Sequence, residues 1–414
     1  MFFALYASVT MKVLQCTSNS YYEGLMTDDI KYLHMLRLIH IRHLTIVMVI
    51  FAVLFIPAQA QQQPKPDLPT PYHLIEHWGQ LPTGRIWGHV FGVGIDSHDN
   101  VWVLDRCGEA SCVTSNVAPI QEFDASGKFI KSFGSGMFVF PHSLLVDKED
   151  HIWITDCGVK GGRGNQVFKL DEDGNVLLTL GKRGVLGGSP DNFLGPTDVA
   201  VSDDGTIFVA DGHAALALGG GEFYGFAKGE EKSSRMRILK FDKTGKILLA
   251  WGREGTGPGE FNVPHGIALD STGRVFVADR GNNRIQIFNQ QGKYLTEWKQ
   301  FGKPCGIFID AKDNIYVADS DSNYDLWDYK YSVDNPCASC VKRVRRPPDV
   351  GLDNVTFTEG IRIGSTNDGV VRAYIPPRMS PAGPIDLTER ISVDAAGDVY
   401  LADARTLHIR KYVK

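Results

Sequence analysis

Two histidines of the sequence share a local pattern that suits metal binding. His142 stands in Phe-Pro-His-Ser-Leu and His265 in Val-Pro-His-Gly-Ile, and each Pro-His pair directly precedes an apolar segment. Imidazole is a common zinc ligand, and a catalytic zinc ion uses three protein ligands while it keeps a fourth position open. A lone histidine in such a place is more often a structural residue of the core. Two at equivalent positions favour a shared metal ion.

A repeat is what makes the positions of these histidines equivalent. Its unit is an apolar strand, a turn rich in Gly, Asn and Asp, and a second apolar strand that ends in Ala-Asp or a similar pair. Most copies continue into a third and a fourth strand across a Gly turn. The six copies lie at 93–105, 144–156, 199–211, 267–279, 307–319 and 391–403.

Such a four-stranded unit cannot bury both of its faces alone, so neighbouring units must stack. The repeat therefore predicts an all-β fold, a six-bladed β-propeller of four-stranded antiparallel blades over residues 85–414. Insertions interrupt the pattern at 214–234 and 321–360. Equivalent positions of the blades point at one axis, so His142 and His265 would meet there although they lie far apart in the sequence.

The composition agrees with a globular protein that has many tight turns. The chain has 414 residues with 44 Gly, and 43% of its residues are hydrophobic, which excludes wholesale disorder. The formal net charge of −5 argues against a general nucleic-acid binder, because such a protein needs a basic surface to neutralise phosphates.

The start of the chain predicts export. Residues 35–60 combine basic residues, an apolar run over 44–56 and the small-residue end Ala58-Gln59-Ala60, which is the pattern of a signal peptide cut after Ala60. The run is shorter than the roughly 20 residues that span a bilayer, so we expect no stable membrane span after cleavage. An uncleaved anchor is the alternative. Residues 1–34 are interpreted as an upstream extension and residues 61–84 as a linker, and the protein is expected to be secreted or periplasmic.

Seven cysteines are present, and six remain once the leader is removed. In an oxidising compartment six can pair. Cys107 and Cys112 bracket a short loop. Cys337-Ala-Ser-Cys340 favours a local disulfide or two unpaired thiols over zinc, because no second pair of this kind lies nearby. Cys157 and Cys305 lie in or beside strand patterns and are expected to be small buried groups.

The blade pattern resembles the NHL repeat. The residues that carry this resemblance best are Phe-Asn-Val-Pro-His-Gly-Ile-Ala-Leu-Asp over 261–270 and Val-Phe-Val-Ala-Asp-Arg-Gly-Asn-Asn-Arg over 275–284. More narrowly, Leu104-Asp105-Arg106, Phe140-Pro141-His142 and Ala210-Asp211-Gly212 resemble peptidyl-α-hydroxyglycine α-amidating lyase, which catalyses the second half-reaction of peptide C-terminal amidation.

This resemblance implies a zinc ion in the central channel that three histidines from different blades hold. His142 and His265 match two of them. The third position falls on Glu389, whose carboxylate can also ligate zinc, so the implied ligand set is His142, His265 and Glu389. Arg390 stands where the family has an Asp that binds a structural calcium ion. A cation at this position disfavours calcium.

The resemblance also implies groups that would act on a substrate. Arg106 and Arg280 match two arginines of the family's site, and paired N–H donors of an Arg can hold a carboxylate or an amide oxygen. The alternative role of each is an ion pair with a neighbouring Asp. The tyrosine that the family uses as a base aligns with His213, which can take a hydroxyl proton or serve as an additional metal ligand. Tyr224 in the inserted loop is a second candidate for the base.

Two functions from different classes remain. The first is a secreted, metal-dependent lyase that cleaves the C–N bond of an N-acyl-α-hydroxyglycine-type hemiaminal to an amide and glyoxylate. Its substrate, a small molecule or a peptide, would lie in the central channel of a monomer. The second is a non-catalytic NHL propeller that binds a peptide, glycan or protein. A lactonase-like hydrolase ranks last, because such enzymes usually centre calcium on acidic and amide side chains.

Overall fold

The computed structural model describes residues 68–189, 191–213, 236–320, 322, 324–328, 342–345, 359–380, 383–384 and 386–414. The chain from Gln61 to Lys414 forms one compact unit. Within the described ranges, no helix combines the length and the apolarity that a bilayer span requires. Several predictions lie outside the described residues: the upstream extension, the leader, the insertion at 214–234 with Tyr224, the pair Cys337 and Cys340, and most of the insertion at 321–360.

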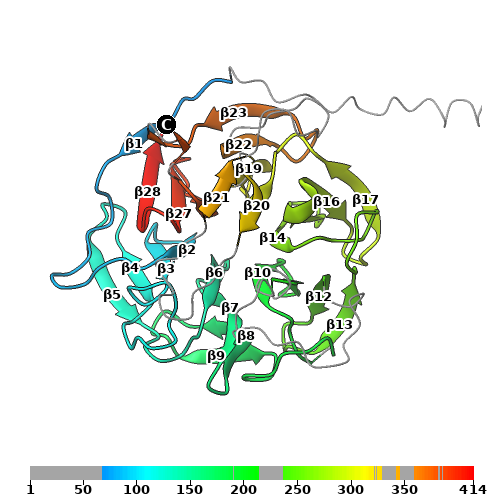
Figure 1. The fold of residues 1–414 in the computed structure, drawn as a ribbon, viewed down its shortest axis with the longest axis horizontal. Coiled ribbons are helices and arrows are strands. Elements are labelled where there is room, and N and C mark those ends of the chain that lie inside the picture. The colour runs from blue at the N-terminus through cyan, green and yellow to red at the C-terminus, as the bar shows by residue number, and fades with distance from the viewer. Residues whose placement is uncertain are drawn as a thin grey trace, which may run out of the picture. The chain divides into compact units, whose positions relative to one another are not determined.

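Six four-stranded antiparallel sheets form the blades of a propeller, which confirms the predicted fold class (Figure 1). The first three blades are β2 (Val90–Ile95), β3 (Val101–Asp105), β4 (Ile120–Phe123) and β5 (Phe129–Phe133); β6 (Pro141–Val146), β7 (Ile152–Lys160), β8 (Arg163–Leu170) and β9 (Val176–Leu180); β10 (Pro196–Val201), β11 (Ile207–Asp211), β12 (Arg237–Phe241) and β13 (Ile247–Trp251).

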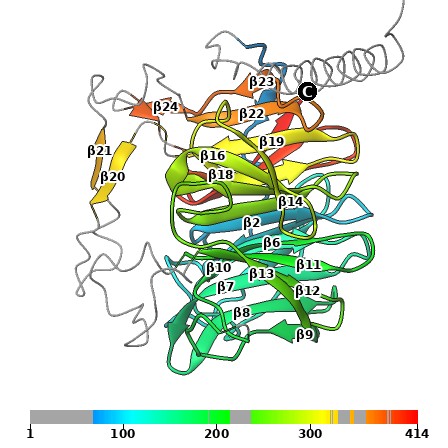
Figure 2. The same ribbon diagram turned by 90° about the vertical axis from the view of Figure 1, so that its right-hand side faces the viewer.

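The other three blades are β14 (Pro264–Leu269), β15 (Val275–Asp279), β16 (Arg284–Phe288) and β17 (Tyr294–Trp298); β18 (Pro304–Ile309), β19 (Asn314–Asp319), β22 (Gly360–Ser365) and β23 (Val371–Ile375); β26 (Thr388–Val393), β27 (Val399–Asp403), β28 (His408–Val413) and β1 (His73–Ile75). Two small ribbons and a 3-10 turn add to the blades: β20 (Tyr324–Asp328) with β21 (Lys342–Arg345), β24 (Met379–Ser380) with β25 (Gly383–Pro384), and η3 (Arg280–Asn282). Figure 2 shows the β20–β21 ribbon to one side of the blades.

The innermost strands form a closed ring around the axis. Each of β2, β6, β10, β14, β18 and β26 contacts the next, and β26 contacts β2 again. Figure 1 shows β2, β6, β10 and β14 near the centre, with β5, β9, β13 and β17 at the rim. The last blade combines both ends of the described chain, because β1 pairs with β28 as the outer strand of this blade. β1 lies within residues 61–84, which the sequence indicates as a linker.

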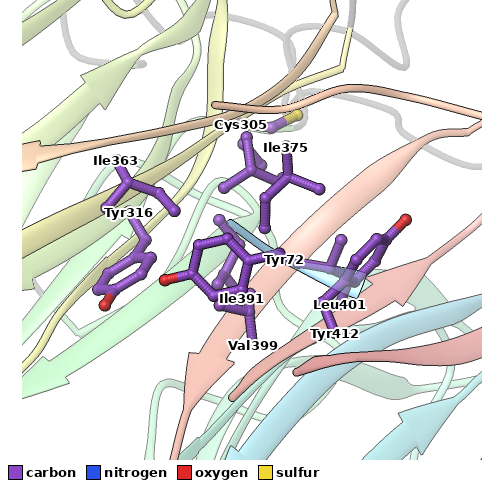
Figure 3. Packing of buried hydrophobic residues seen from close by; sticks show 11 residues of the cluster. Tyr72, Cys305, Tyr316, Ile363, Ile375, Ile391, Val399, Leu401 and Tyr412 are labelled. Carbon is purple, nitrogen blue, oxygen red and sulfur yellow. The ribbon is translucent and has the colours of Figure 1, made fainter. Parts of the chain in front are cut away.

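The hydrophobic core lies between neighbouring blades. Each of the six buried clusters draws its residues from two adjacent sheets. Figure 3 shows the cluster between the last two blades, where Tyr316 and Ile363 of one sheet face Leu401 and Tyr412 of the other. Removing such apolar surface from water is the main force that stacks the blades.

In at least five of the six blades a buried carboxylate anchors the loop that leads into the inner strand. The Asp that ends the second strand of a blade is at most 2% exposed in all six blades. In the fourth blade Asp279 accepts the backbone N–H of Asn262 at 2.7 Å, and in the third Asp211 accepts that of Leu194 at 2.7 Å. This contact fixes the start of the inner strand, which is the place where the candidate histidines lie.

The inner strands approach one another closely where two glycines follow the site positions. A Cβ atom on Gly266 would lie 2.7 Å from the carbonyl oxygen of Cys305, and one on Gly306 would lie 2.5 Å from that of Glu389. Only a residue without a side chain allows this approach. The glycines therefore let the starts of neighbouring inner strands converge on the axis.

Candidate metal centre

The second residue of every inner strand belongs to one layer around the axis. In all six blades the register with the second strand shifts across this residue. Such bulges redirect a side chain and are common next to active sites. The six residues of the layer are Phe91, His142, Thr197, His265, Cys305 and Glu389.

Three imidazoles converge at this layer. His142 lies on β6, His265 on β14, and His213 follows the end of β11. One ring nitrogen from each lies within 4.8 Å of those of the other two. The ring centroids are 4.6 Å apart for His142 and His213 and 4.9 Å apart for His142 and His265. The structure therefore brings together the two histidines that share a pattern and adds His213 to them.

Backbone carbonyls orient two of these rings. The Nδ1 atom of His142 lies 2.8 Å from the oxygen of Thr197, and Nδ1 of His265 lies 3.0 Å from the oxygen of Cys305. A carbonyl oxygen only accepts hydrogen bonds, so each Nδ1 carries the proton and each Nε2 carries a lone pair. Both carbonyls belong to the next blade, so the stacking of blades sets the ring orientations.

The nitrogens that remain suit a metal ion. Nε2 of His142, Nε2 of His265 and Nδ1 of His213 are buried without a hydrogen-bond partner among the described residues. His142 and His265 are fully buried, so these atoms have no access to water. A buried polar atom without a partner is costly, and coordination to a metal ion would satisfy it. The donor set is thus one that zinc binds readily.

The surroundings keep all three imidazoles neutral, as metal ligation requires. Burial, together with the charge of Arg280, lowers the pKa of His213 to about 3. Burial and the neighbouring His213 lower the pKa of His142 well below its usual range. Burial and Arg280 do the same for His265. The rings therefore offer lone pairs rather than positive charges at neutral pH.

Glu389 lies beside this cluster and is 3% exposed. Its Oε2 atom is 3.8 Å from Nε2 of His265, and it accepts a hydrogen bond from the thiol of Cys305 at 3.5 Å. Ligand atoms of His265, Cys305 and Glu389 form a second group within 4.8 Å of one another. His265 is thus shared by two groups, one of three histidines and one that contains Glu389.

Arg106 and Arg280 both lie at the centre. The guanidinium carbon of Arg106 is 3.3 Å from the ring centroid of Phe91 and 3.4 Å from that of Phe140, so two aromatic rings hold it on opposite sides. Its Nε donates to the oxygen of Pro141, the residue before His142, at 3.2 Å. Arg280 begins η3 and is 4% exposed. Burial lowers the pKa of His213 and His265 most, and the charge of Arg280 is the second cause for both.

The aspartates that precede these two arginines have other partners. Asp105 pairs with Arg85 at 2.7 Å, and Asp279 pairs with Arg284 at 2.8 Å. The buried carboxylates are thus neutralised by arginines outside the central layer.

Arg390 binds backbone oxygens from three different blades. Its Nη2 donates to the oxygens of Thr197 at 2.7 Å and His265 at 3.2 Å, and its Nη1 donates to the oxygen of Glu389 at 2.8 Å. Its Nε lies 3.4 Å from the carboxylate of Asp198. A guanidinium therefore holds the oxygens at this point of the axis.

A strained residue and a disulfide lie close in sequence to two residues of the site. Val263, two residues before His265, has φ of 60°, which is rare for a β-branched residue and costs about 1–3 kcal/mol. Cys107, which follows Arg106, forms a disulfide with Cys112. Cys157 and Cys305 are both buried, as the sequence indicates. Sequence reasoning missed that Cys305 faces the site, although Pro304-Cys305-Gly306 repeats the pattern of Pro264-His265-Gly266.

Comparisons with known proteins agree with this architecture. The family model of the NHL repeat matches residues 261–288. NHL repeat-containing protein 3 of Homo sapiens is 32% identical over 233 residues, which are 55% of this chain and 59% of the relative. Peptidyl-alpha-hydroxyglycine alpha-amidating lyase 1 of Drosophila melanogaster is 34% identical over 176 residues, 40% of this chain and 28% of the relative.

A longer alignment is weaker in identity. Peptidyl-glycine alpha-amidating monooxygenase B of Xenopus laevis is 27% identical over 386 residues, which are 85% of this chain and 37% of that relative. Each of these alignments covers less than two thirds of the relative's own length.

Solved structures share the fold. A gluconolactonase of Xanthomonas campestris superposes with a TM-score of 0.51 at 13% identity. The superposition covers 80% of this chain and 87% of the gluconolactonase chain. At this identity the likeness concerns the fold alone. From the repeat, the six blades and these relatives, the chain is a six-bladed β-propeller with an NHL-repeat match over residues 261–288, and it resembles the peptidyl-α-hydroxyglycine α-amidating lyases.

Proposed function

We propose that this protein is a metal-dependent lyase that splits an N-acyl-α-hydroxyglycine-type hemiaminal into an amide and glyoxylate. The proposal rests on three buried ring nitrogens at the axis of the propeller that have no hydrogen-bond partner within the described part of the chain. The resemblance to amidating lyases supports the reaction class. His142 and His265 would hold a zinc ion, which as a Lewis acid would supply stabilisation of negative charge on a substrate oxygen.

The arginines would bind the acid part of the substrate. A carboxylate between Arg106 and Arg280 would receive paired N–H donors from a guanidinium that Phe91 and Phe140 already hold in place. The same groups would stabilise the glyoxylate that leaves. Because both arginines are nearly buried, the low local dielectric would strengthen this interaction.

The reaction itself needs one proton acceptor. Loss of the hydroxyl proton lets the C–O bond become a carbonyl while the C–N bond breaks, and the amide nitrogen then receives a proton. His213 and Tyr224 are the candidates that the sequence indicates for this step. A pKa of about 3 makes His213 a weak base at neutral pH.

Metal content tests the proposal. Purified mature protein should carry stoichiometric zinc, and the double variant His142→Ala, His265→Ala should carry none. Wild-type protein should convert an N-acyl-α-hydroxyglycine to amide and glyoxylate, and the double variant should not. Wild-type protein without any transition metal would remove the basis for a lyase.

A second candidate function is a non-catalytic propeller that binds a peptide, glycan or protein. It is favoured by a relative named only for its NHL repeats and by the departures at Glu389, Arg390 and His213. Wild-type protein that retains zinc but converts no N-acyl-α-hydroxyglycine would favour this candidate.

We also propose that the protein acts outside the cytoplasm as a monomer. The disulfide between Cys107 and Cys112 supports this placement, because such bonds persist in oxidising compartments. The leader pattern at 35–60 supports it too. N-terminal sequencing of the exported protein should find Gln61 as the first residue.

A further inference from the structure

The structure offers two places for one metal ion, and they exclude each other. His265 belongs both to the group with His142 and His213 and to the group with Cys305 and Glu389. Its Nδ1 donates to the oxygen of Cys305, so only Nε2 has a lone pair, and one lone pair serves one ion. Which group binds the metal therefore depends on the hydrogen bonds that the other residues of each group already make.

The two groups differ in how many of their ligand atoms are already used. In the histidine group each ring has a buried nitrogen with no hydrogen-bond partner among the residues that the structure describes. In the other group the thiol of Cys305 already donates to Glu389 Oε2. A metal among the histidines would satisfy three atoms and break no hydrogen bond between described residues. A metal between Cys305 and Glu389 would break their hydrogen bond and leave His142 and His213 unsatisfied.

Glu389 is well placed for a different task. Its Oε2 atom is 3.8 Å from the Nε2 atom of His265 that would face the metal. The thiol of Cys305 fixes this oxygen, and Arg390 holds the backbone oxygen of Glu389 at 2.8 Å. A substrate hydroxyl beside the metal would therefore lie next to a carboxylate that the Cys305 thiol positions, on a residue whose backbone Arg390 holds.

We propose that His142, His213 and His265 are the metal ligands and that Glu389 Oε2 accepts the hydroxyl proton of the substrate. The second part rests on the proposed lyase function. The proton moves from the substrate oxygen to Oε2, the carbonyl forms, the C–N bond breaks, and the proton returns to the amide nitrogen. Relative to the expectations from the sequence, His213 and Glu389 exchange the roles of base and ligand.

Two single variants of the full mature chain separate ligand from base. His213→Ala should weaken zinc binding more than roughly 100-fold, because loss of a residue that only orients a ligand already costs 10–100-fold. Glu389→Gln keeps the shape of the side chain but cannot take a proton, so it should retain wild-type zinc content and lose turnover. The exposed His98→Ala is the matched control and should change neither. Zinc is measured per chain after dialysis, and affinity by competition with a chelator.

A third variant guards against misfolding. His213→Cys offers a thiolate, which is itself a zinc ligand, so it should restore binding. With cobalt in place of zinc this variant should show a thiolate-to-metal absorption band that wild type lacks. A merely structural role of His213 would not produce that band.

The outcomes point in distinct directions. Zinc lost in Glu389→Gln and kept in His213→Ala overturns the ligand assignment. Zinc lost in His213→Ala, while wild type converts no N-acyl-α-hydroxyglycine, confirms the ligands and overturns the role of Glu389 together with the lyase function. Turnover that survives in Glu389→Gln overturns the base alone. Wild type without metal overturns both parts.

Discussion

At the scale of residues, the chemistry of the channel follows from one position repeated in every blade. The second residue of each inner strand sits at a shift of register that turns its side chain toward the axis. His142, His265 and Glu389 occupy three of these positions, and Cys305 a fourth. Changing a residue there changes the site without changing the blade.

Arg106 provides a test of substrate binding at this scale. Arg106→Lys keeps the charge but loses the planar group that stacks between Phe91 and Phe140 and the paired N–H donors. We expect kcat/KM on an N-acyl-α-hydroxyglycine to fall about tenfold, or about 1.4 kcal/mol, through a higher KM. The exposed Arg372→Lys is the control. An unchanged KM would show that Arg106 does not bind the substrate.

The sequence predicts part of this site and not the rest. Repetition identifies His142 and His265, because equivalent positions of blades share a direction. It does not show that His213, which lies after β11 rather than on an inner strand, reaches the same point. That contact depends on the distance across the closed ring, which no local pattern encodes. Cys305 is missed because its residue type is common in cores.

At the scale of elements, the buried Asp at the end of the second strand connects the loop before the inner strand with an arginine side chain. Asp279 illustrates it: burial raises the pKa of its carboxyl group, while the N–H of Asn262 and the guanidinium of Arg284 stabilise the charged form. The alternating apolar strands and the Ala-Asp ends allow this element to be predicted from the sequence. In the last four blades the arginine partner comes from the third strand, whereas Asp105 pairs with Arg85, which precedes its blade; these pairings are visible only in the structure.

Removing one arginine partner tests this connection. Arg284→Ala leaves the carboxylate of Asp279 buried without its guanidinium, and loss of one partner of a buried pair costs about 3–5 kcal/mol. The exposed pair of Arg372 and Asp368 should contribute less than about 1 kcal/mol, so Arg372→Ala is the control. Urea unfolding measures both. Equal stabilities of the two variants would contradict the structural role of Asp279.

At the scale of the whole molecule, the inner strands form a closed ring. The outer strand of the last blade is β1, which pairs with β28 near the end of the chain. The count of repeats predicts six blades. It does not predict that β1 completes the last blade, because a strand of three residues carries no periodic signal. Arg390 adds a cross-link at the axis through oxygens from three blades.

This cross-link predicts how the fold responds to calcium. The guanidinium of Arg390 already binds the oxygens of Thr197, His265 and Glu389. Added calcium should therefore leave the melting temperature of the wild type unchanged, whereas any ion that binds only the folded state would raise it. Thermal unfolding with and without calcium decides this, and a rise in the melting temperature would show that the chain holds calcium after all.

Stability should also depend on His89. Burial and the charge of Arg106 lower the pKa of this imidazole to about 4, whereas its unfolded value is 6.5. As the pH falls, His89 is protonated in the unfolded chain before it is protonated in the folded one. The free energy of unfolding therefore has its full His89 contribution above pH 6.5 and loses it as the pH falls towards 4. The stability lost in this way is on the order of 3 kcal/mol.

The comparison with His89→Gln isolates this contribution from other groups. Asp156 acts in the opposite direction, because burial raises the pKa of its carboxyl group to about 6 and its contribution therefore grows as the pH falls. Wild type should lose more stability than His89→Gln between pH 6.5 and 4 in urea unfolding. Parallel curves for the two proteins would contradict the assigned pKa of His89.

The most direct measurement is anomalous diffraction at the zinc absorption edge from crystals of the purified mature protein. We expect one anomalous peak on the propeller axis, about 2.0–2.1 Å from a ring nitrogen of each of His142, His213 and His265. The carboxylate of Glu389 should lie beside the ion rather than bound to it. A peak bound by Glu389 and His265 without His213, or crystals with no peak at this position, would show that the three histidines do not form a metal site.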